Sequence, residues 1–160
     1  MAKIKMLVMD VDGTLTDGCI YIGAEGEMMK AFNVQDGYAI ANILPKKNMV
    51  PVIITGRHSK IVEMRAQELK IAHLHQGVSD KLSKLKEVAL RLNAAPEEIA
   101  YIGDDVNDLE CIHWCGCTAC PADAAPEVLK AVDYVCTRDG GRGAVREFIE
   151  KLRSVDLELM

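Results

Sequence analysis

Short apolar runs rich in β-branched residues alternate along this chain with longer stretches in which apolar residues recur at helical spacing. This alternation is typical of a parallel sheet with helices on both faces, because parallel strands must be joined by crossover segments. We therefore predict an α/β fold built on such a sheet. The predicted strands cover residues 4–9, 50–54, 72–75, 99–102, 115–119 and 133–136.

The stretches between these strands have the period of amphipathic helices. Leu85, Val88 and Leu92, for example, fall on one helical face, and Ser59 suits the N-cap of the helix that follows it. No internal repeat or linker-like segment interrupts the 160 residues, so we predict a single domain over residues 1–160. The predicted helices lie near residues 37–47, 59–69, 81–92, 107–113, 126–131 and 143–153.

One segment, at about residues 19–32, breaks the alternation. It reads as two short strands, 19–22 and 27–32, around the polar turn Gly23-Ala24-Glu25-Gly26. This pattern predicts a β-hairpin with a loop of about four residues, directly after the first strand. Because an isolated two-stranded hairpin is marginally stable in water, we expect it to pack against another surface, such as a second subunit.

The charge and hydropathy of the chain limit its partners. The net charge is −5 and the pI is about 5.4, which disfavours nonspecific binding to nucleic acid or to an anionic membrane. No apolar run approaches the roughly 18 residues of a membrane span. The apolar start is short and ends in Asp10 and Asp12, so we expect a first strand and a cytoplasmic protein rather than a signal peptide.

Six cysteines raise the question of a disulfide framework or a metal site. Four of them, together with His113, lie between residues 111 and 120, but their spacing is not that of two separated CxxC pairs. Free cysteine behaves as a small apolar residue. We interpret these cysteines as core packing, with metal binding or redox chemistry as the alternative.

Polar residues lie at four of the predicted junctions between a strand and the following helix. In a doubly wound sheet these junctions meet at the carboxyl edge, where ligands bind. The segments are Asp10-Val11-Asp12-Gly13-Thr14 after the first strand, Thr55-Gly56-Arg57 after the second, Lys81 at the start of the helix after the third, and Gly103-Asp104-Asp105-Val106-Asn107-Asp108 after the fourth.

This set of residues predicts hydrolysis of a phosphate ester. The Asp10 carboxylate would attack phosphorus and form an aspartyl-phosphate. Asp10, Asp104 and the carbonyl of Asp12 offer the oxygen ligands that Mg²⁺ prefers, and the cation would offset the repulsion between two anions. The Asp12 carboxyl would protonate the leaving oxygen and later activate water. Thr55 and Lys81 would bind the phosphoryl oxygens.

Three further residues of the fourth segment have supporting roles in this hypothesis. Asp108 would orient Lys81 or a metal-bound water, and Asn107 would hydrogen-bond within the loop. Asp105 has no assigned contact. Each motif is weak alone, but their order and their places at strand ends favour function over a chance pattern.

The motifs closely resemble those of the haloacid dehalogenase superfamily of phosphatases. Within it, the chain resembles the small, capless family of 3-deoxy-D-manno-octulosonate 8-phosphate phosphatases. The matching segments are DVDGT at 10–14, AFNVQDGYAI at 31–40, TGRHSKIVEMR at 55–65, HQGVSDK at 75–81, GDDVND at 103–108 and GGRGAVRE at 140–147.

This resemblance implies a Rossmann-like fold of the haloacid dehalogenase type without a cap domain, Mg²⁺ dependence, and a homotetramer whose hairpins assemble into a central barrel. It also implies a cytoplasmic enzyme of lipopolysaccharide biosynthesis. The residues support the capless form independently. The segments from Asp12 to Asp36 and from Thr55 to Lys81 are too short for a cap domain, which needs on the order of 50 residues.

The substrate implied by the resemblance is a phosphorylated sugar acid. A guanidinium group matches a carboxylate in bidentate fashion, so Arg57 and Arg65 are candidates for binding a second anionic group, although Arg65 also suits a solvated helix face. The family contacts substrate through residues that correspond to Asn33, Val34, Gln35, Asp36 and Gly37, and Gly56 lies beside Thr55.

One related activity competes with this substrate prediction. Arg57 favours the eight-carbon substrate, because the family that acts on 2-keto-3-deoxynonulosonate 9-phosphate carries an acidic residue there. Ala41 weakens this preference, since an arginine is common at that position. A catalytically idle tetramerisation domain is a further alternative, whereas a receiver domain is disfavoured because no phosphorylatable aspartate ends the third strand.

Overall fold

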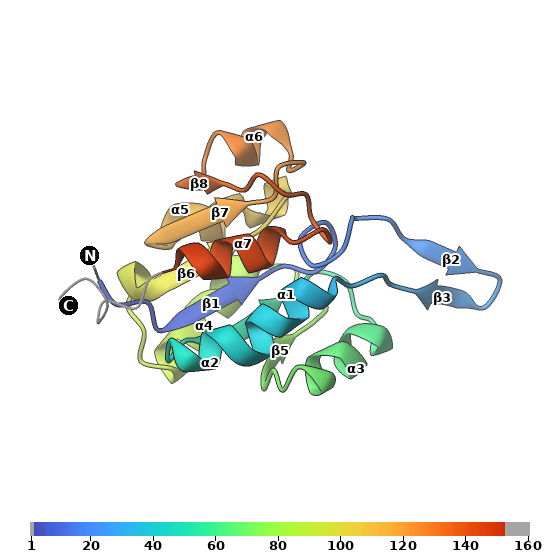
Figure 1. The fold of residues 1–160 in the computed structure, drawn as a ribbon, viewed down its shortest axis with the longest axis horizontal. Coiled ribbons are helices and arrows are strands. Elements are labelled where there is room, and N and C mark those ends of the chain that lie inside the picture. Colours follow the sequence, from blue (N-terminus) through green and yellow to red (C-terminus); the bar gives the residue numbers. More distant parts are fainter. Residues whose placement is uncertain (1, 153–160) are drawn as a thin grey trace.

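The computed structural model describes residues 2–152 and contains a six-stranded parallel sheet and a separate two-stranded hairpin (Figure 1). The order in the large sheet is β5-β4-β1-β6-β7-β8, so the chain leaves β1 in one direction and later returns to extend the other side. The strands are β1 (Met6–Met9), β2 (Tyr21–Gly23), β3 (Gly26–Met29), β4 (Val50–Ile54), β5 (His73–His75), β6 (Ile99–Ile102), β7 (Cys117–Cys120) and β8 (Tyr134–Val135).

Helices cover both faces of the large sheet, which confirms the predicted fold class. On one face lie α1 (Val34–Tyr38), the π-helical turn η1 (Ala39–Ile43), α2 (Leu44–Lys46), α3 (Lys60–Glu68) and α7 (Ala144–Lys151). On the other lie α4 (Lys81–Arg91), α5 (Leu109–Trp114) and α6 (Pro126–Leu129). Short 3₁₀ turns, η2 (Pro96–Glu98) and η3 (Val106–Asp108), flank β6. None of the helices within residues 2–152 is long and apolar enough to cross a membrane.

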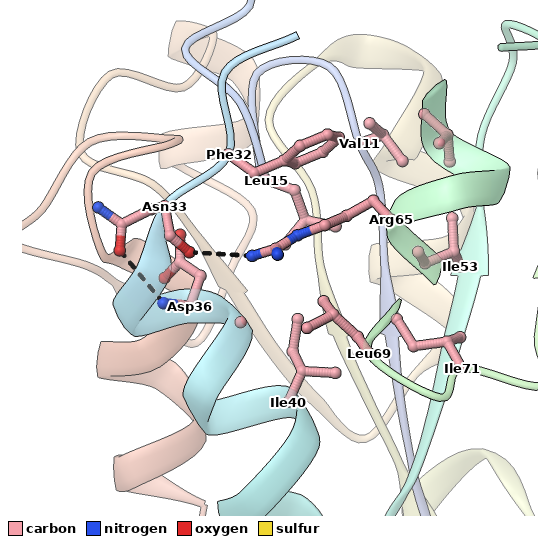
Figure 2. A pocket seen from close by; sticks show the side chains of 12 residues that line it. Val11, Leu15, Phe32, Asn33, Asp36, Ile40, Ile53, Arg65, Leu69 and Ile71 are labelled. Carbon is pink, nitrogen blue, oxygen red and sulfur yellow. Dashed lines mark hydrogen bonds between the residues drawn. The ribbon is translucent and has the colours of Figure 1, made fainter. Parts of the chain in front are cut away.

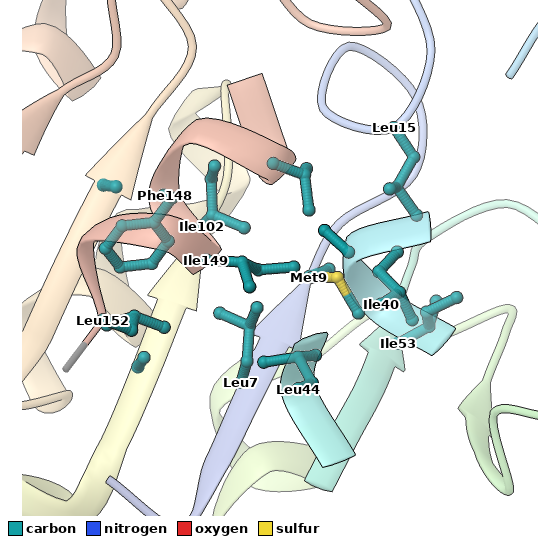
Figure 3. Close-up of a cluster of buried hydrophobic side chains, with 14 of the residues drawn as sticks. Leu7, Met9, Leu15, Ile40, Leu44, Ile53, Ile102, Phe148, Ile149 and Leu152 are labelled. Atoms are coloured by element: carbon teal, nitrogen blue, oxygen red, sulfur yellow. The ribbon is translucent and has the colours of Figure 1, made fainter. Parts of the chain in front are cut away.

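The central strand β1 is buried on both faces, and its side chains alternate between two apolar clusters. Leu7 and Met9 pack with Phe148 and Ile149 of α7, whereas Val8 packs on the opposite side. Figure 3 shows the first cluster between β1 and the helices that cover it. Because successive strand residues point to opposite faces, an unbroken apolar run such as this one suits a sheet covered by two layers of helices.

The hairpin projects beyond the carboxyl edge of the sheet (Figure 1), as the sequence predicts, but its loop is shorter than predicted. Gly23 pairs directly with Gly26 across a connection of two residues, Ala24 and Glu25. The reason is the backbone of Gly26, whose φ of +115° is open to glycine and closes the turn tightly. The strands are also shorter than the predicted ranges 19–22 and 27–32.

The first helix begins three residues before the predicted start at residue 37. The side chain of Asn33 accepts hydrogen bonds from the backbone N–H groups of Gln35 (2.8 Å) and Asp36 (3.2 Å), and this N-cap starts α1 at Val34. Residues 33–37, which the resemblance assigns to substrate contact, are therefore an N-cap and a first helical turn.

Other element boundaries differ from the predicted ones by a few residues. The strand predicted at 115–119 begins at Cys117, because the backbone N–H of Cys115 still donates to the Cys111 carbonyl and so belongs to the end of α5. Strands β1, β5 and β8 are shorter than predicted, as are helices α6 and α7. Arg153, the predicted end of the last helix, lies outside the described residues.

Candidate active site

The motif residues meet at the carboxyl edge of the sheet, around the central strand. Asp10 follows β1 directly, Thr55 follows β4, and Lys81 is the first residue of α4. Asp104 and Asp108 lie just beyond β6, the other neighbour of β1. The strand order therefore brings together residues that are far apart in the sequence, at the point where a doubly wound sheet changes direction.

A buried ammonium group links the two sides of this site. The Nζ atom of Lys81 donates to Oδ1 of Asp10 (3.0 Å) and to Oδ1 of Asp108 (2.8 Å), and all three side chains are almost fully buried. Burial opposes the charged ammonium, but the carboxylates of Asp10 and Asp108 outweigh that effect and raise the pKa of Lys81. Lys81 therefore stays positively charged beside Asp10.

Asp108 uses both of its oxygens to hold its surroundings. In addition to Lys81, Oδ1 accepts a hydrogen bond from the hydroxyl of Tyr101 (2.5 Å). Its Oδ2 accepts from the backbone N–H groups of Asp104 (3.0 Å) and Asp105 (3.2 Å). Four donors occupy this carboxylate, so Asp108 orients Lys81 and the loop after β6. No motif marks Tyr101, which reads in the sequence as one more apolar strand residue.

Carboxylate oxygens of Asp10, Asp104 and Asp108 lie within 4.8 Å of one another. Burial and the charge of Asp10 raise the pKa of Asp104 to about 8, while burial and the charge of Asp108 raise the pKa of Asp10. These shifts reflect carboxylates that repel each other in a low dielectric. Since Asp108 is already saturated with donors, Asp10 and Asp104 are the two side chains that fit a hard divalent cation.

The loop after β1 must pass very close to Asp104. Gly13 has a φ of +90°, and a Cβ atom there would lie 1.9 Å from Oδ2 of Asp104. The next residue, Thr14, donates its hydroxyl to Oδ1 of the same carboxylate (3.1 Å). Glycine at position 13 and the hydroxyl at position 14 therefore fix the loop against the carboxylate, which explains these two residues of the DVDGT segment.

Asp12 lies at the more open side of the site and contacts residues of the hairpin. Its Oδ1 accepts a hydrogen bond from Nζ of Lys30 (2.6 Å), and its Oδ2 lies 3.9 Å from Nε of Arg57. Nζ of Lys30 also lies 3.3 Å from Oε2 of Glu27. Neither Lys30 nor Glu27 was among the predicted site residues, because no motif marks them and only the tertiary fold brings them to Asp12.

The second motif places Thr55 in a buried turn and Arg57 at the surface. The backbone N–H of Thr55 donates to the His75 carbonyl (2.9 Å), and its carbonyl accepts from Val78 (3.1 Å). Gly56 lies beside the Val78 carbonyl, with about 3.7 Å between that oxygen and an added Cβ. The side chain of Arg57 is half exposed and faces Asp12 and Glu27, so it borders the site.

Arg65 contacts other residues of this chain, at an apolar pocket between α1 and α3 (Figure 2). Its guanidinium lies 5.5 Å from the centre of the Phe32 ring and donates to the Asn33 carbonyl (3.4 Å). An added Cβ at Gly37 would meet Nη2 of Arg65 at 2.3 Å, so this glycine makes room for the guanidinium. Arg65 thus stabilises the start of α1. Its contact with substrate stays a prediction.

The remaining predicted residues are spread over the neighbouring surface. Asp36 is buried, with Oδ1 accepting from the backbone N–H of Arg146 (2.9 Å), and burial raises its pKa. Val34 and Gln35 are exposed. Beyond β6, Asp105 caps η3 through a hydrogen bond from the N–H of Val106 (2.8 Å), and Asn107 is exposed.

The cysteines between residues 111 and 120 pack in or against the core, as the sequence favours, whereas Cys19 is exposed. All six are free thiols, and Cys111 and Cys120 are fully buried in one apolar cluster and Cys136 in the other. Burial raises the pKa of Cys111 to about 12 and that of Cys120 to about 11, so these thiols stay protonated. Within residues 2–152, the potential metal-binding group is the aspartate cluster, not the cysteines.

Comparison with known proteins agrees with this geometry. Residues 67–149 match the family described as haloacid dehalogenase-like hydrolase. A 3-deoxy-D-manno-octulosonate 8-phosphate phosphatase of Salmonella typhi is 47% identical over 150 residues, which cover 94% of this chain and 79% of the relative. The chain belongs to this family of haloacid dehalogenase-like phosphatases.

Solved structures of the octulosonate phosphatase family share the fold over nearly the whole chain. The enzyme from Yersinia pestis is 46% identical, with a TM-score of 0.90 over 93% of this chain and 80% of its own. The enzyme from Moraxella catarrhalis, solved with a magnesium ion, a phosphate ion and a KDO molecule, is 41% identical, with a TM-score of 0.89 over 93% of this chain and 85% of its own. Like these structures, residues 2–152 form the sheet and hairpin without a cap domain.

Proposed function

We propose that this protein is a Mg²⁺-dependent phosphatase that hydrolyses 3-deoxy-D-manno-octulosonate 8-phosphate to the free sugar acid and phosphate. The observation that carries the proposal is the pair of carboxylates, Asp10 and Asp104, at adjacent strand ends, with the Lys81 ammonium 3.0 Å from Asp10. The names of the relatives supply the substrate, and the Moraxella catarrhalis structure supports magnesium as the metal.

In the first half of the proposed reaction, a carboxylate oxygen of Asp10 attacks phosphorus and the bond to the sugar oxygen breaks. Asp12 donates its proton to that oxygen, so the sugar acid leaves as an alcohol. Lys81 fixes the Asp10 carboxylate and offers its charge to the phosphoryl oxygens, together with the hydroxyl of Thr55. The product of this half-reaction is an aspartyl-phosphate on Asp10.

In the second half, water attacks the phosphorus of the aspartyl-phosphate. Asp12, now a carboxylate, accepts a proton from the water, and the bond between phosphorus and Asp10 breaks to release inorganic phosphate. When bound by Asp10, Asp104 and the carbonyl of Asp12, Mg²⁺ supplies the positive charge that offsets repulsion between the carboxylates and the phosphoryl group. Asp108 keeps Lys81 in place throughout, and Asp105 and Asn107 support the same loop.

The proposed substrate site lies beside Arg57, whose half-exposed guanidinium makes only long contacts, with Asp12 (3.9 Å) and Glu27 (3.8 Å), and would bind the carboxylate of the substrate. Around it we propose contacts from Gly56, Arg65 and the segment of residues 33–37. Arg57 favours the eight-carbon sugar acid over the alternative, 2-keto-3-deoxynonulosonate 9-phosphate. The single domain over residues 1–160, the cytoplasmic location and the role in lipopolysaccharide biosynthesis belong to the same proposal.

We also propose a homotetramer assembled through the hairpins. The hairpin exposes Ile22 and Met28, each 69% exposed, and also Met29. Such apolar side chains on an isolated two-stranded ribbon favour burial against other copies. A tetramer without catalysis, the idle-domain alternative, would need none of the buried charges around Lys81, and their retention favours the enzyme.

The test is phosphate release from a panel of sugar-acid phosphates with Mg²⁺ and with a chelator. We expect turnover of the eight-carbon substrate, and loss of it with the chelator. Asp10→Asn should lower turnover by at least about 10⁴-fold, because an amide cannot act as the nucleophile that divides the reaction into two steps. Its thermal unfolding should remain cooperative, which separates lost chemistry from a lost fold.

Three outcomes would overturn parts of this proposal. No turnover of any ester would support the idle tetramerisation domain. A preference for the nine-carbon substrate would move the protein to the sister activity. Wild-type rates in Asp10→Asn would reject the nucleophile.

A further inference from the structure

A buried lysine lies at the foot of the hairpin, one residue beyond β3. The side chain of Lys30 is only 2% exposed, and its Nζ donates to Oδ1 of Asp12 at 2.6 Å. The same ammonium lies 3.3 Å from Oε2 of Glu27, within the hairpin. Lys30 is therefore shared by a carboxylate of the reaction site and a carboxylate of the hairpin.

This arrangement differs from an ordinary surface ion pair. A desolvated ammonium is costly unless it is paired, whereas an exposed pair contributes little. Glu27 is itself fixed, because the hydroxyl of Ser59, the N-cap of α3, donates to Oε1 of Glu27 (2.5 Å). One chain of contacts thus runs from the helix after the second motif, through the hairpin, to Asp12.

We propose that Lys30 is a positioning residue that holds the Asp12 carboxyl on the leaving-group side of the site, and that Glu27 in turn holds Lys30. This inference rests on the proposed function, in which Asp12 transfers the proton to the sugar oxygen. The backbone of Asp12 is fixed by the loop after β1, but its side chain is partly exposed, and Lys30 makes its shortest contact. Loss of Lys30 would leave Asp12 free to rotate away.

Leaving-group chemistry can separate this role from a general effect on the fold. A sugar alkoxide is a poor leaving group and needs a proton from Asp12, whereas p-nitrophenolate leaves well without one. The kcat/KM value reports the steps up to the departure of the leaving group, so it does not include the later attack of water. A residue that acts through Asp12 must therefore affect the two kinds of ester unequally.

The experiment compares wild type and Lys30→Met with 3-deoxy-D-manno-octulosonate 8-phosphate and with an activated ester, p-nitrophenyl phosphate. We expect kcat/KM for the sugar-acid phosphate to fall by about 10- to 100-fold, part of the 10²–10⁴-fold that a general acid supplies. The fall for the activated ester should be no more than about threefold. Lys30→Arg should recover much of the loss, because it restores a cation near Asp12.

A double-variant comparison tests whether Lys30 acts through Asp12. In an Asp12→Asn background, adding Lys30→Met should change kcat/KM for the sugar-acid phosphate by less than about twofold, because coupled residues are not additive. Glu27→Gln should give a smaller loss of the same kind. The matched control is Lys130→Met, an exposed lysine on the last turn beyond α6, which should behave as wild type.

Equal losses with both kinds of ester, or full additivity with Asp12→Asn, would overturn the assignment of Lys30. So would an unchanged kcat/KM for the sugar-acid phosphate. These results differ from a failure of the proposed function, in which the wild-type protein itself would hydrolyse neither kind of ester.

Discussion

Asp10 and Asp104 place a buried and a partly buried carboxylate side by side, so the stability of the fold depends on pH and on metal binding. The pKa of Asp104 is raised from 3.8 to about 8 by burial and by the charge of Asp10. Between those two values the folded chain keeps a proton that the unfolded chain has lost. The contribution of Asp104 to the free energy of unfolding of the metal-free protein therefore falls as the pH rises through this range.

Magnesium should reverse this trend, because it binds the deprotonated carboxylates. We expect the increase in Tm caused by Mg²⁺ to be larger at about pH 8 than at about pH 6, since the proton competes with the metal at the lower pH. A metal at 100 times its Kd contributes about 2.7 kcal/mol, enough to shift Tm by several degrees. Thermal unfolding at both pH values, with Mg²⁺ or chelator, measures the effect.

Asp104→Asn is the control for this prediction, because it removes the titrating group and one proposed metal ligand. It should abolish most of the difference between the two pH values. An equal Mg²⁺ effect at both pH values in the wild-type protein would contradict the prediction.

Arg57 allows a second prediction at the scale of one residue. Its side chain is half exposed and lies 3.9 Å from Asp12, so its removal leaves the core intact. We expect Arg57→Ala to raise KM for the sugar-acid phosphate by about tenfold and to lower kcat less, because a contact with a remote carboxylate binds the ground state and the transition state alike. Steady-state kinetics measure both constants.

The matched control for Arg57 is Arg91→Ala, an exposed arginine at the end of α4 that pairs with Glu87. It should leave KM unchanged. If Arg57→Ala also leaves KM unchanged, Arg57 does not bind the substrate carboxylate.

At the scale of elements, the hairpin exposes apolar side chains that another subunit would bury. Replacing Ile22 and Met28 together with lysine should prevent the hairpins from packing, because each charge would need to be buried in the assembly. We expect the mass in solution to fall from that of a tetramer to that of a monomer. Sedimentation or light scattering measures this directly.

Leu90→Lys is the control for the hairpin variant, because Leu90 is equally apolar and 84% exposed but lies on α4. It should leave the mass unchanged. A wild-type monomer, or a tetramer that survives both hairpin substitutions, would reject assembly through the hairpin.

The same elements show what the sequence can and cannot predict. Strands β4 and β6 match their predicted limits, because each apolar run ends where a motif begins, at Thr55 or at Gly103. The predictions of the first residue of α1 and of the length of the hairpin loop were wrong by a few residues. The side-chain cap at Asn33 determines where α1 begins, and the φ of Gly26 determines the length of the loop. These local features override the boundaries that the spacing of apolar residues predicts, and they do not change that spacing.

Across the whole molecule, the motifs at the strand ends predict Asp10, Lys81 and Asp104 as site residues, and the strand order places these three residues close together. The motifs do not identify residues that matter through one tertiary contact. Tyr101 reads as core until its hydroxyl meets Asp108, and Lys30 reads as a surface lysine until the hairpin folds it onto Asp12. Such residues belong to no sequence motif, because only the folded structure determines which side chain they contact.

The central place of β1 also has a consequence for synthesis of the chain. This strand leaves the ribosome long before its second neighbour, β6, which ends at Ile102. At ~5–20 residues per second, an apolar edge stays unpaired for several seconds, which makes the nascent chain a candidate for chaperone binding. A nascent chain that stops before Asp104 lacks the carboxylate pair, so it cannot yet form the proposed metal site.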